Sequence, residues 1–215
     1  MEIVYTYSHL GGEEILMVRH PELDQEIYDV IKKIQCSGRC KISKEKTMLG
    51  KALYSPIELN SLFKQEFNER GWSEIRDKFD VILPDYPHIV KGAFKQCDFF
   101  KDRVLIEVQF GKYAFMFYDL AKFQYFYNRD FIKLGVEIVP CHLLQRQMSS
   151  GVSYGEQLIY DLERLSKNFP SVPVKIILVD IPIEEDDYEK EERLKMREVR
   201  KEVSFYLGKM AKNFK

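Results

Sequence analysis

The chain lacks any hydrophobic run approaching the roughly 20 apolar residues that a membrane-spanning helix requires. Its first residues, from Met1 to Leu10, also lack the basic start and apolar stretch of a secretion signal. We therefore expect a cytoplasmic protein with no membrane partner. Cysteine is scarce as well. Of the four cysteines, only Cys36 and Cys40 lie close together in the sequence, and no second Cys or His pair accompanies them at metal-ligand spacing. We expect reduced thiols and neither a zinc site nor a disulfide framework.

An excess of charge of either sign is also missing. The chain carries 33 basic and 34 acidic residues, for a net charge of -1. This balance argues against a protein that coats nucleic acid by bulk electrostatics, so any DNA-binding surface must be local. With 215 residues, of which 45% are hydrophobic, the chain can bury an ordinary core without needing disulfides or metal ions to stabilise it. We expect one domain over residues 1–215.

Helices and strands alternate along the sequence. Apolar spacing predicts a helix from Leu23 to Ile34 and a second from Ser55-Pro56 to about Gly71. Short β-branched runs predict strands at 104–110, 135–139 and 174–181. The pattern indicates an α/β fold, a central mixed β-sheet flanked by helices. After the last predicted strand, alternating charges with apolar residues at helical spacing predict a charged helical extension over residues 183–215.

The segment from Cys36 to Lys51 is polar and basic, which predicts an exposed loop or short hairpin. Lys44 and Lys46 are its candidate DNA contacts, because lysine ammonium groups bind phosphates. A solvated surface without a partner explains the same composition.

Two later segments also predict helices. Residues 113–127 (YAFMFYDLAKFQYFY) are aromatic nearly all round, more than one face of a small core absorbs, so part of this helix is a candidate subunit interface. On that interpretation, replacing Phe123 with Glu yields monomers; core packing is the alternative. Ser153 and Glu156 have the spacing of a capping box and predict a helix start at about Tyr154.

Candidate chemistry centres on the strand VLIEVQF. Alternation places Glu107 and Gln109 on one side of it, and a carboxylate within an apolar strand costs free energy unless something compensates it. Asp98 precedes Glu107 by nine residues, close enough for a preceding strand to bring both carboxylates together. With the backbone carbonyl of Val108 they would offer hard oxygen ligands to Mg²⁺, which suits phosphodiester hydrolysis. Glu74 is a further candidate for this cluster.

This spacing of acids has a plain alternative. A structural salt bridge to a nearby cation explains the two carboxylates about as well as a metal does. The available cations are Lys101, Arg103 and Lys112.

Asp98, Glu107 and Gln109 resemble the metal-binding core of the PD-(D/E)XK nucleases, in the variant in which Gln replaces the usual third Lys or Glu. More widely, the chain resembles the BstYI-like type II restriction endonucleases, relatives of BglII and BamHI. The similar stretches occur in one order: YSHLGG (7–12), SKEKT (43–47), LYSPIELN (53–60), KDRVLIEVQFGKYAF (101–115), GVEIVP (135–140) and MSSGVSY (148–154).

The resemblance implies a role for each matched residue. Asp98, Glu107 and the main-chain oxygen of Val108 would bind Mg²⁺, and Gln109 would orient the attacking water. The positions that read bases in the DNA major groove would be Lys112, Ser149 and Ser150.

The resemblance also implies an activity, namely Mg²⁺-dependent hydrolysis of double-stranded DNA at a GATC-centred palindrome, purine-GATC-pyrimidine, leaving 5′ overhangs. A homodimer fits a palindrome because each subunit reads one half-site. A cognate DNA methyltransferase acting on the same site is expected. Two alternatives use the same fold: a structure-specific repair or recombination nuclease, and a non-catalytic DNA-binding protein.

Overall fold

The computed structural model describes residues 1–165 and 168–182. Residues Met1–Ile181 form one compact unit. The charged helix expected at 183–215 lies outside the described residues, so that prediction stays open. Within the described residues, no helix is both long and apolar enough to cross a bilayer.

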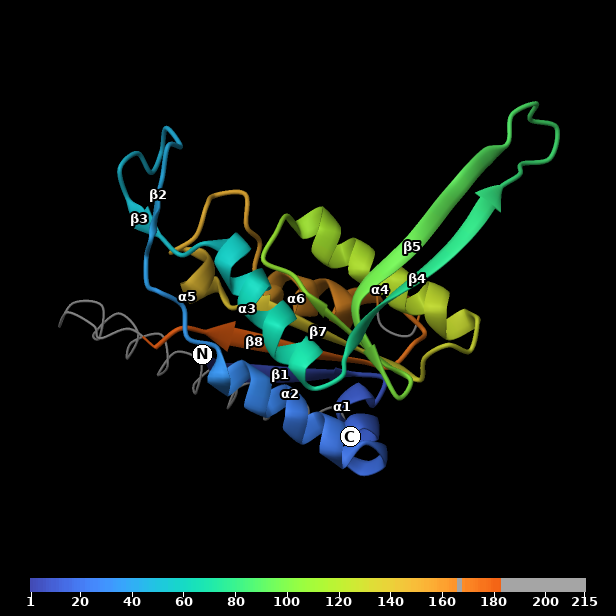
Figure 1. The fold of residues 1–215 in the computed structure, drawn as a ribbon, viewed down its shortest axis with the longest axis horizontal. Coiled ribbons are helices and arrows are strands. Elements are labelled where there is room, and N and C mark those ends of the chain that lie inside the picture. The colour runs from blue at the N-terminus through green and yellow to red at the C-terminus, as the bar shows by residue number, and fades with distance from the viewer. Residues whose placement is uncertain (166–167, 183–215) are drawn as a thin grey trace, which may run out of the picture. The chain divides into compact units, whose positions relative to one another are not determined.

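A mixed six-stranded sheet forms the centre of this unit (Figure 1). The strand order is β1-β8-β7-β6-β5-β4, in which β6, β7 and β8 run parallel and the other neighbours pair antiparallel. The strands are β1 (Glu2–His9), β4 (Ser73–Val81), β5 (Val90–Lys101), β6 (Val104–Val108), β7 (Leu134–Pro140) and β8 (Val174–Asp180). The expected α/β fold with a mixed sheet is confirmed.

The three parallel strands lie in the interior. Every residue of β6, β7 and β8 is buried, as expected for strands covered on both faces. Each strand nevertheless carries buried charge: Glu107 in β6, Glu137 in β7, and Lys175 with the terminal Asp180 in β8. Buried charges need partners, so these positions indicate that the sheet has a role beyond forming the hydrophobic core.

Helices cover both faces of the sheet. They are α1 (Gly12–Arg19), α2 (Pro21–Lys33), α3 (Pro56–Glu69), α4 (Tyr113–Asn128), α5 (His142–Gln145) and α6 (Gly155–Leu165). The face with α4 and α6 fits so closely that Gly135 of β7 has no room for a side chain: a Cβ there would meet the Phe123 ring at 2.6 Å. On the opposite face, Lys175 of β8 bonds Asp24 of α2 at 2.7 Å. The order is helix, sheet, helix.

Several local predictions are confirmed. The predicted helices correspond to α2 and α3, and the Ser55 side chain caps α3 by accepting a hydrogen bond from the Glu58 backbone N–H. The basic segment contains a two-stranded hairpin of β2 (Lys41–Ile42) and β3 (Ala52–Leu53). The helix predicted from the spacing of Ser153 and Glu156 corresponds to α6, which begins at Gly155, one residue after the expected start.

The assignment of Phe123 to a subunit interface is wrong. This ring lies on the inner side of α4 with no exposed surface, together with Met116, Leu120 and Phe126. A glutamate at position 123 would bury a charge in the core and destabilise the fold instead of separating subunits. The exposed aromatic side chains of α4 are Phe115 and Tyr118, at 56% and 45% exposure.

Candidate active site

The edges of β5 and β6 part where the candidate carboxylates lie. Their ladder runs from the Lys101–Val104 pair to the Phe99–Ile106 pair, and in Figure 1 the β4–β5 hairpin extends away from the body of the sheet. Just past the end of the ladder, Asp98 accepts a hydrogen bond from the Val108 backbone N–H at 3.3 Å. The Asp98 carboxylate thus takes the place of the missing strand partner.

The carbonyl of Val108 is directed to the same gap. The Gln109 N–H bonds Ile138 of β7 at 3.0 Å, so residue 109 uses the β7 side of the strand. Successive residues in a strand direct their backbone groups to opposite sides, and the N–H and C=O of one residue share a side. Val108 therefore presents both groups toward β5 and Asp98, as its expected role as a main-chain ligand requires.

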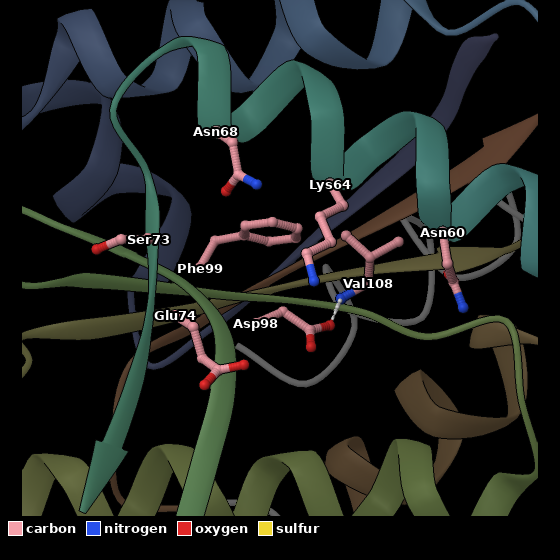
Figure 2. A pocket seen from close by; sticks show the side chains of 8 residues that line it. All are labelled: Asn60, Lys64, Asn68, Ser73, Glu74, Asp98, Phe99 and Val108. Carbon is pink, nitrogen blue, oxygen red and sulfur yellow. Dashed lines mark hydrogen bonds between the residues drawn. The ribbon is translucent and has the colours of Figure 1, made fainter.

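An open pocket of about 350 Å³ lies beside this gap, between α3 and the parted strands (Figure 2). It is lined by Asn60, Lys64, Asn68, Ser73, Glu74, Asp98, Phe99 and Val108. Figure 2 shows Lys64 reaching from α3 toward Asp98, with Glu74 on the neighbouring strand. The pocket thus combines one ammonium group with two carboxylates, and it contains Glu74 as well as Asp98.

Glu107 lies on the other side of the gap, beneath α4. Its side chain is almost fully buried and forms an ion pair with Lys122 at 2.5 Å, while Asp119, one turn earlier on α4, pairs with the same ammonium group at 2.8 Å. The alternative salt bridges were wrong in their partners, because Lys101 pairs with Glu26 and Arg103 with Asp130.

The buried cluster is short of positive charge. The Lys122 ammonium group forms ion pairs with Glu107 and Asp119, and a third buried carboxyl group, that of Glu137, lies close enough to interact electrostatically with all three. Burial, and after it the carboxylates of Asp119 and Asp98, raises the pKa of Glu107 well above its usual range. Burial alone would lower the pKa of Lys122, but the adjoining carboxylates outweigh it and raise that pKa.

Glu137 deepens this deficit. It lies opposite Glu107 in the parallel β6–β7 register, is fully buried, and has no hydrogen-bond partner for either carboxyl oxygen among the described residues. Burial raises its pKa well above the usual range. A site with surplus buried carboxylates next to an exposed carboxylate and a free carbonyl suits a hard divalent cation.

A ready cage of side chains is not present, however. Within residues 1–165 and 168–182, no group of three or more His, Cys, Asp or Glu side chains is arranged to hold a metal ion. A cation at the gap would therefore combine Asp98 and Glu107 with the Val108 carbonyl and solvent, a ligand set that fits Mg²⁺, which commonly retains several waters.

Gln109 is held by a residue that sequence reasoning missed. Its side-chain Nε2 donates to Asp119 Oδ2 at 2.8 Å. Asp119 and Lys122 are the charged residues of the aromatic segment 113–127, three positions apart on one helical face. That spacing was the signal that could have revealed them, just as Glu137 repeats in GVEIV the buried-acid pattern of Glu107 in VLIEV.

The three candidate base-reading residues and the basic hairpin meet in one region. Lys41 donates to the Ser149 hydroxyl, and the Ser150 N–H donates to Glu45 across 105 residues of sequence at 3.0 Å. The turn before Lys112 joins the same loop, because Gly111 accepts from the Ser153 N–H at 2.8 Å.

The two remaining candidates, Lys44 and Lys46, lie on this hairpin. Both are exposed and form no recorded hydrogen bond or ion pair with the described part of the chain. Their ammonium groups are therefore available to a partner.

Comparison with known proteins agrees with this geometry. The family described as restriction endonuclease BglII/BglIII matches residues 4–179. The chain is 26% identical over 181 residues to the type II restriction enzyme BglII of Bacillus subtilis, covering 80% of this chain and 72% of that enzyme.

Two solved structures share the fold. BglII complexed with a DNA 16-mer superimposes with a TM-score of 0.67 at 22% identity, over 86% of this chain and 79% of that one. Free BglII gives a TM-score of 0.58 at 22% identity, over 86% and 82%. The family match covers most of the chain, including every candidate site residue. The chain therefore belongs to the BglII/BglIII family of restriction endonucleases and is a type II site-specific deoxyribonuclease.

Proposed function

We propose that this enzyme is a Mg²⁺-dependent homodimer that cuts double-stranded DNA at a GATC-centred palindrome, purine-GATC-pyrimidine, leaving 5′ overhangs. The observation that carries the proposal is the gap between β5 and β6, where Asp98 and the backbone of Val108 meet beside a pocket that holds Lys64. The proposed DNA recognition sequence is supported by the resemblance of this chain to BstYI-like enzymes. The relative crystallised with a DNA 16-mer supports duplex DNA as the substrate. The helical extension at 183–215 is proposed as part of the same single domain.

Asp98, Glu107 and the Val108 carbonyl would hold the metal. When bound, Mg²⁺ polarises a phosphate oxygen and lowers the pKa of a nearby water. Lys64 supplies positive charge to the pocket in which the scissile phosphate would lie. Gln109 orients the attacking water through its side-chain oxygen; an amide is no base at neutral pH, so it holds the water without taking its proton.

Base reading is assigned to Lys112, Ser149 and Ser150. A lysine can donate to guanine O6 and N7, and a serine hydroxyl can donate or accept. Their convergence supports this assignment, because the turn at Gly111 and the loop at 149–153 are joined by a backbone hydrogen bond. A cognate methyltransferase would protect the host's copies of the same site.

The proposal is tested by digesting a sequenced plasmid with the purified enzyme in Mg²⁺ and in EDTA, and sequencing the fragment ends. Cuts confined to GATC-centred hexamers and absent in EDTA are expected. Cuts that follow DNA structure, such as branches or flaps, would instead identify a repair or recombination nuclease. Specific binding without cleavage in any divalent cation would identify a non-catalytic DNA-binding protein.

Lys44 and Lys46 are expected to contact phosphates instead of bases. Replacing both with alanine should weaken binding equally at specific and random sites. It should also lower the slope of log K against log salt by roughly 4, since each of the two subunits loses two phosphate contacts and each contact contributes about 0.9. The measurement is a salt titration of DNA affinity by fluorescence anisotropy in EDTA. Removing two exposed charges from α1 and α2, Arg19 and Lys32, is the matched control and should leave the slope unchanged. A change that differs between specific and random DNA would contradict a phosphate role.

The proposed subunit contact lies on the exposed side of α4. Phe115 projects there at 56% exposure, so Phe115→Glu should halve the mass measured by light scattering and reduce double-strand cleavage. The matched control is Ile57→Glu on α3, which changes an even more exposed apolar side chain, at 83%. An undiminished dimer mass for Phe115→Glu would exclude this face of α4 as the contact.

A further inference from the structure

The side-chain amide of Gln109 is hydrogen-bonded at one end and lies close to a glycine at the other. Its Nε2 donates to Asp119 Oδ2 at 2.8 Å, and its Oε1 occupies the space beside Gly111, where an added Cβ would lie 2.5 Å away. Asp119 belongs to α4 and Gly111 to the turn between β6 and α4. The two residues therefore act on opposite ends of one amide.

The orientation of this amide follows from charge. The other oxygen of Asp119, Oδ1, lies 2.8 Å from the Lys122 ammonium group, which keeps Asp119 bound as a carboxylate. A carboxylate only accepts hydrogen bonds, so it must face the NH₂ end of the amide; the reverse orientation would set oxygen against oxygen. The acceptor end of Gln109 is thereby turned away from α4.

We propose that Asp119 and Gly111 are positioning residues that present the side-chain oxygen, and not the NH₂ group, of Gln109 to the attacking water. Asp119 selects the orientation and Gly111 leaves the space that the oxygen needs. The inference rests on the proposed function, in which Gln109 orients that water. Lys122 has a supporting part, since it occupies the Asp119 oxygen that Gln109 does not use.

The substitution Asp119→Asn tests the orientation directly. Lys122 would still claim the oxygen of the new side chain, so its NH₂ group would face Gln109. Two NH₂ groups cannot bond each other, and Gln109 is expected to rotate, presenting NH₂ to the water. Single-turnover cleavage should fall about ten- to a hundred-fold, because a misplaced group near the reacting atoms costs that much. DNA affinity in EDTA should not change.

With glutamate at position 109, the substitution Asp119→Asn should raise the cleavage rate instead of lowering it. The carboxylate of Gln109→Glu would repel Asp119, whereas an asparagine at 119 could donate to one of its oxygens and leave the other for the water. The double variant Asp119→Asn, Gln109→Glu should therefore cleave faster than Gln109→Glu alone. A merely structural role for Asp119 predicts additive losses and no such reversal.

Two further variants complete the test. Gly111→Ala should slow cleavage by displacing the Gln109 oxygen, a mobile side-chain end whose shift leaves the fold intact. Asp29→Asn is the matched control: Asp29 accepts from the Gln25 side chain at 2.8 Å on the exposed face of α2, so the same chemical change should leave cleavage at the wild-type rate.

The readouts are single-turnover cleavage, DNA affinity in EDTA, and the ¹⁵N side-chain amide resonance of Gln109 in metal-free protein, identified by its loss in Gln109→Glu. Protection of that NH₂ group from exchange, lost in Asp119→Asn, is the expected result. Wild-type cleavage by Asp119→Asn, or a double variant no faster than Gln109→Glu, would overturn the inference alone. Wild-type enzyme that fails to cleave DNA in Mg²⁺ would overturn the proposed function, and the inference with it.

Discussion

Replacing Asp98 with Asn should abolish cleavage while leaving DNA binding in place. Asp98 is the exposed carboxylate of the gap between β5 and β6, and its substitution removes a charged ligand from a site where the cation would stabilise developing negative charge. Loss of about 4 kcal/mol of this stabilisation corresponds to a rate reduction on the order of a thousand-fold. The asparagine oxygen can still accept from the Val108 N–H, so the gap should keep its shape.

The measurement is single-turnover cleavage of a duplex carrying one site, with affinity measured separately in EDTA. Asp102→Asn is the matched control, because Asp102 is exposed in the adjoining turn and asparagine tolerates its positive φ of 46°. A cleavage rate for Asp98→Asn within ten-fold of wild type would exclude Asp98 as an essential ligand.

Replacing Lys122 with Met should give the largest loss of stability. This ammonium group lies between Glu107 and Asp119 and is only 13% exposed, so its removal leaves buried carboxylates without a cation. Breaking a buried pair in this way costs about 3–5 kcal/mol, which lowers the melting temperature of a chain of this size by roughly 6–20 °C.

The loss should depend on pH in a defined direction. Burial already raises the pKa of Glu107 and of Asp119 in the wild-type protein although Lys122 lowers both, so removing this ammonium group should raise them further. A group with a raised folded pKa contributes stability that is fully present below its unfolded pKa and is lost as pH rises through the folded pKa. The variant should therefore approach wild type at about pH 4, close to the unfolded pKa values, and should fall increasingly below it as the pH rises.

Thermal melts across this pH range measure the effect. Lys133→Met is the matched control, since Lys133 and Asp130 have the same three-residue spacing but lie in solvent, at 47% and 76% exposure. An exposed pair contributes at most about 1 kcal/mol. Equal melting temperatures for Lys122→Met and Lys133→Met would show that the buried cluster does not depend on its ammonium group.

Sequence reasoning succeeded where one local pattern determines the outcome. The β-branched run predicted as a strand over 104–110 and the Ser55-Pro56 start signal each specify an element by their own residues. Both elements are present, although the strand ends at Val108. The spacing of Asp98 and Glu107 likewise predicted two strands joined by a tight turn.

The buried cluster escaped because it depends on pairing between distant segments. Glu137 is adjacent to Glu107 only through the parallel register of β6 and β7, and Lys122 reaches Glu107 only because α4 crosses that face. The interpretation of Phe123 failed for a related reason. An aromatic helix does not reveal which of its sides meets the sheet until the position of Gly135, which accommodates the ring, is known.

The contacts between the basic hairpin and the loop at 149–150 bear on fidelity. Ser149 already accepts from Lys41 and Ser150 already donates to Glu45 before any DNA arrives. In its proposed role, the Ser149 hydroxyl must exchange Lys41 for a base, whereas Ser150 contacts Glu45 through its backbone N–H. A wrong base then competes with a bond that can re-form at once, and not with loosely held water. The free protein thereby already contains an interaction that disfavours a near-cognate sequence, because the loop returns to its internal hydrogen bond when the base does not fit.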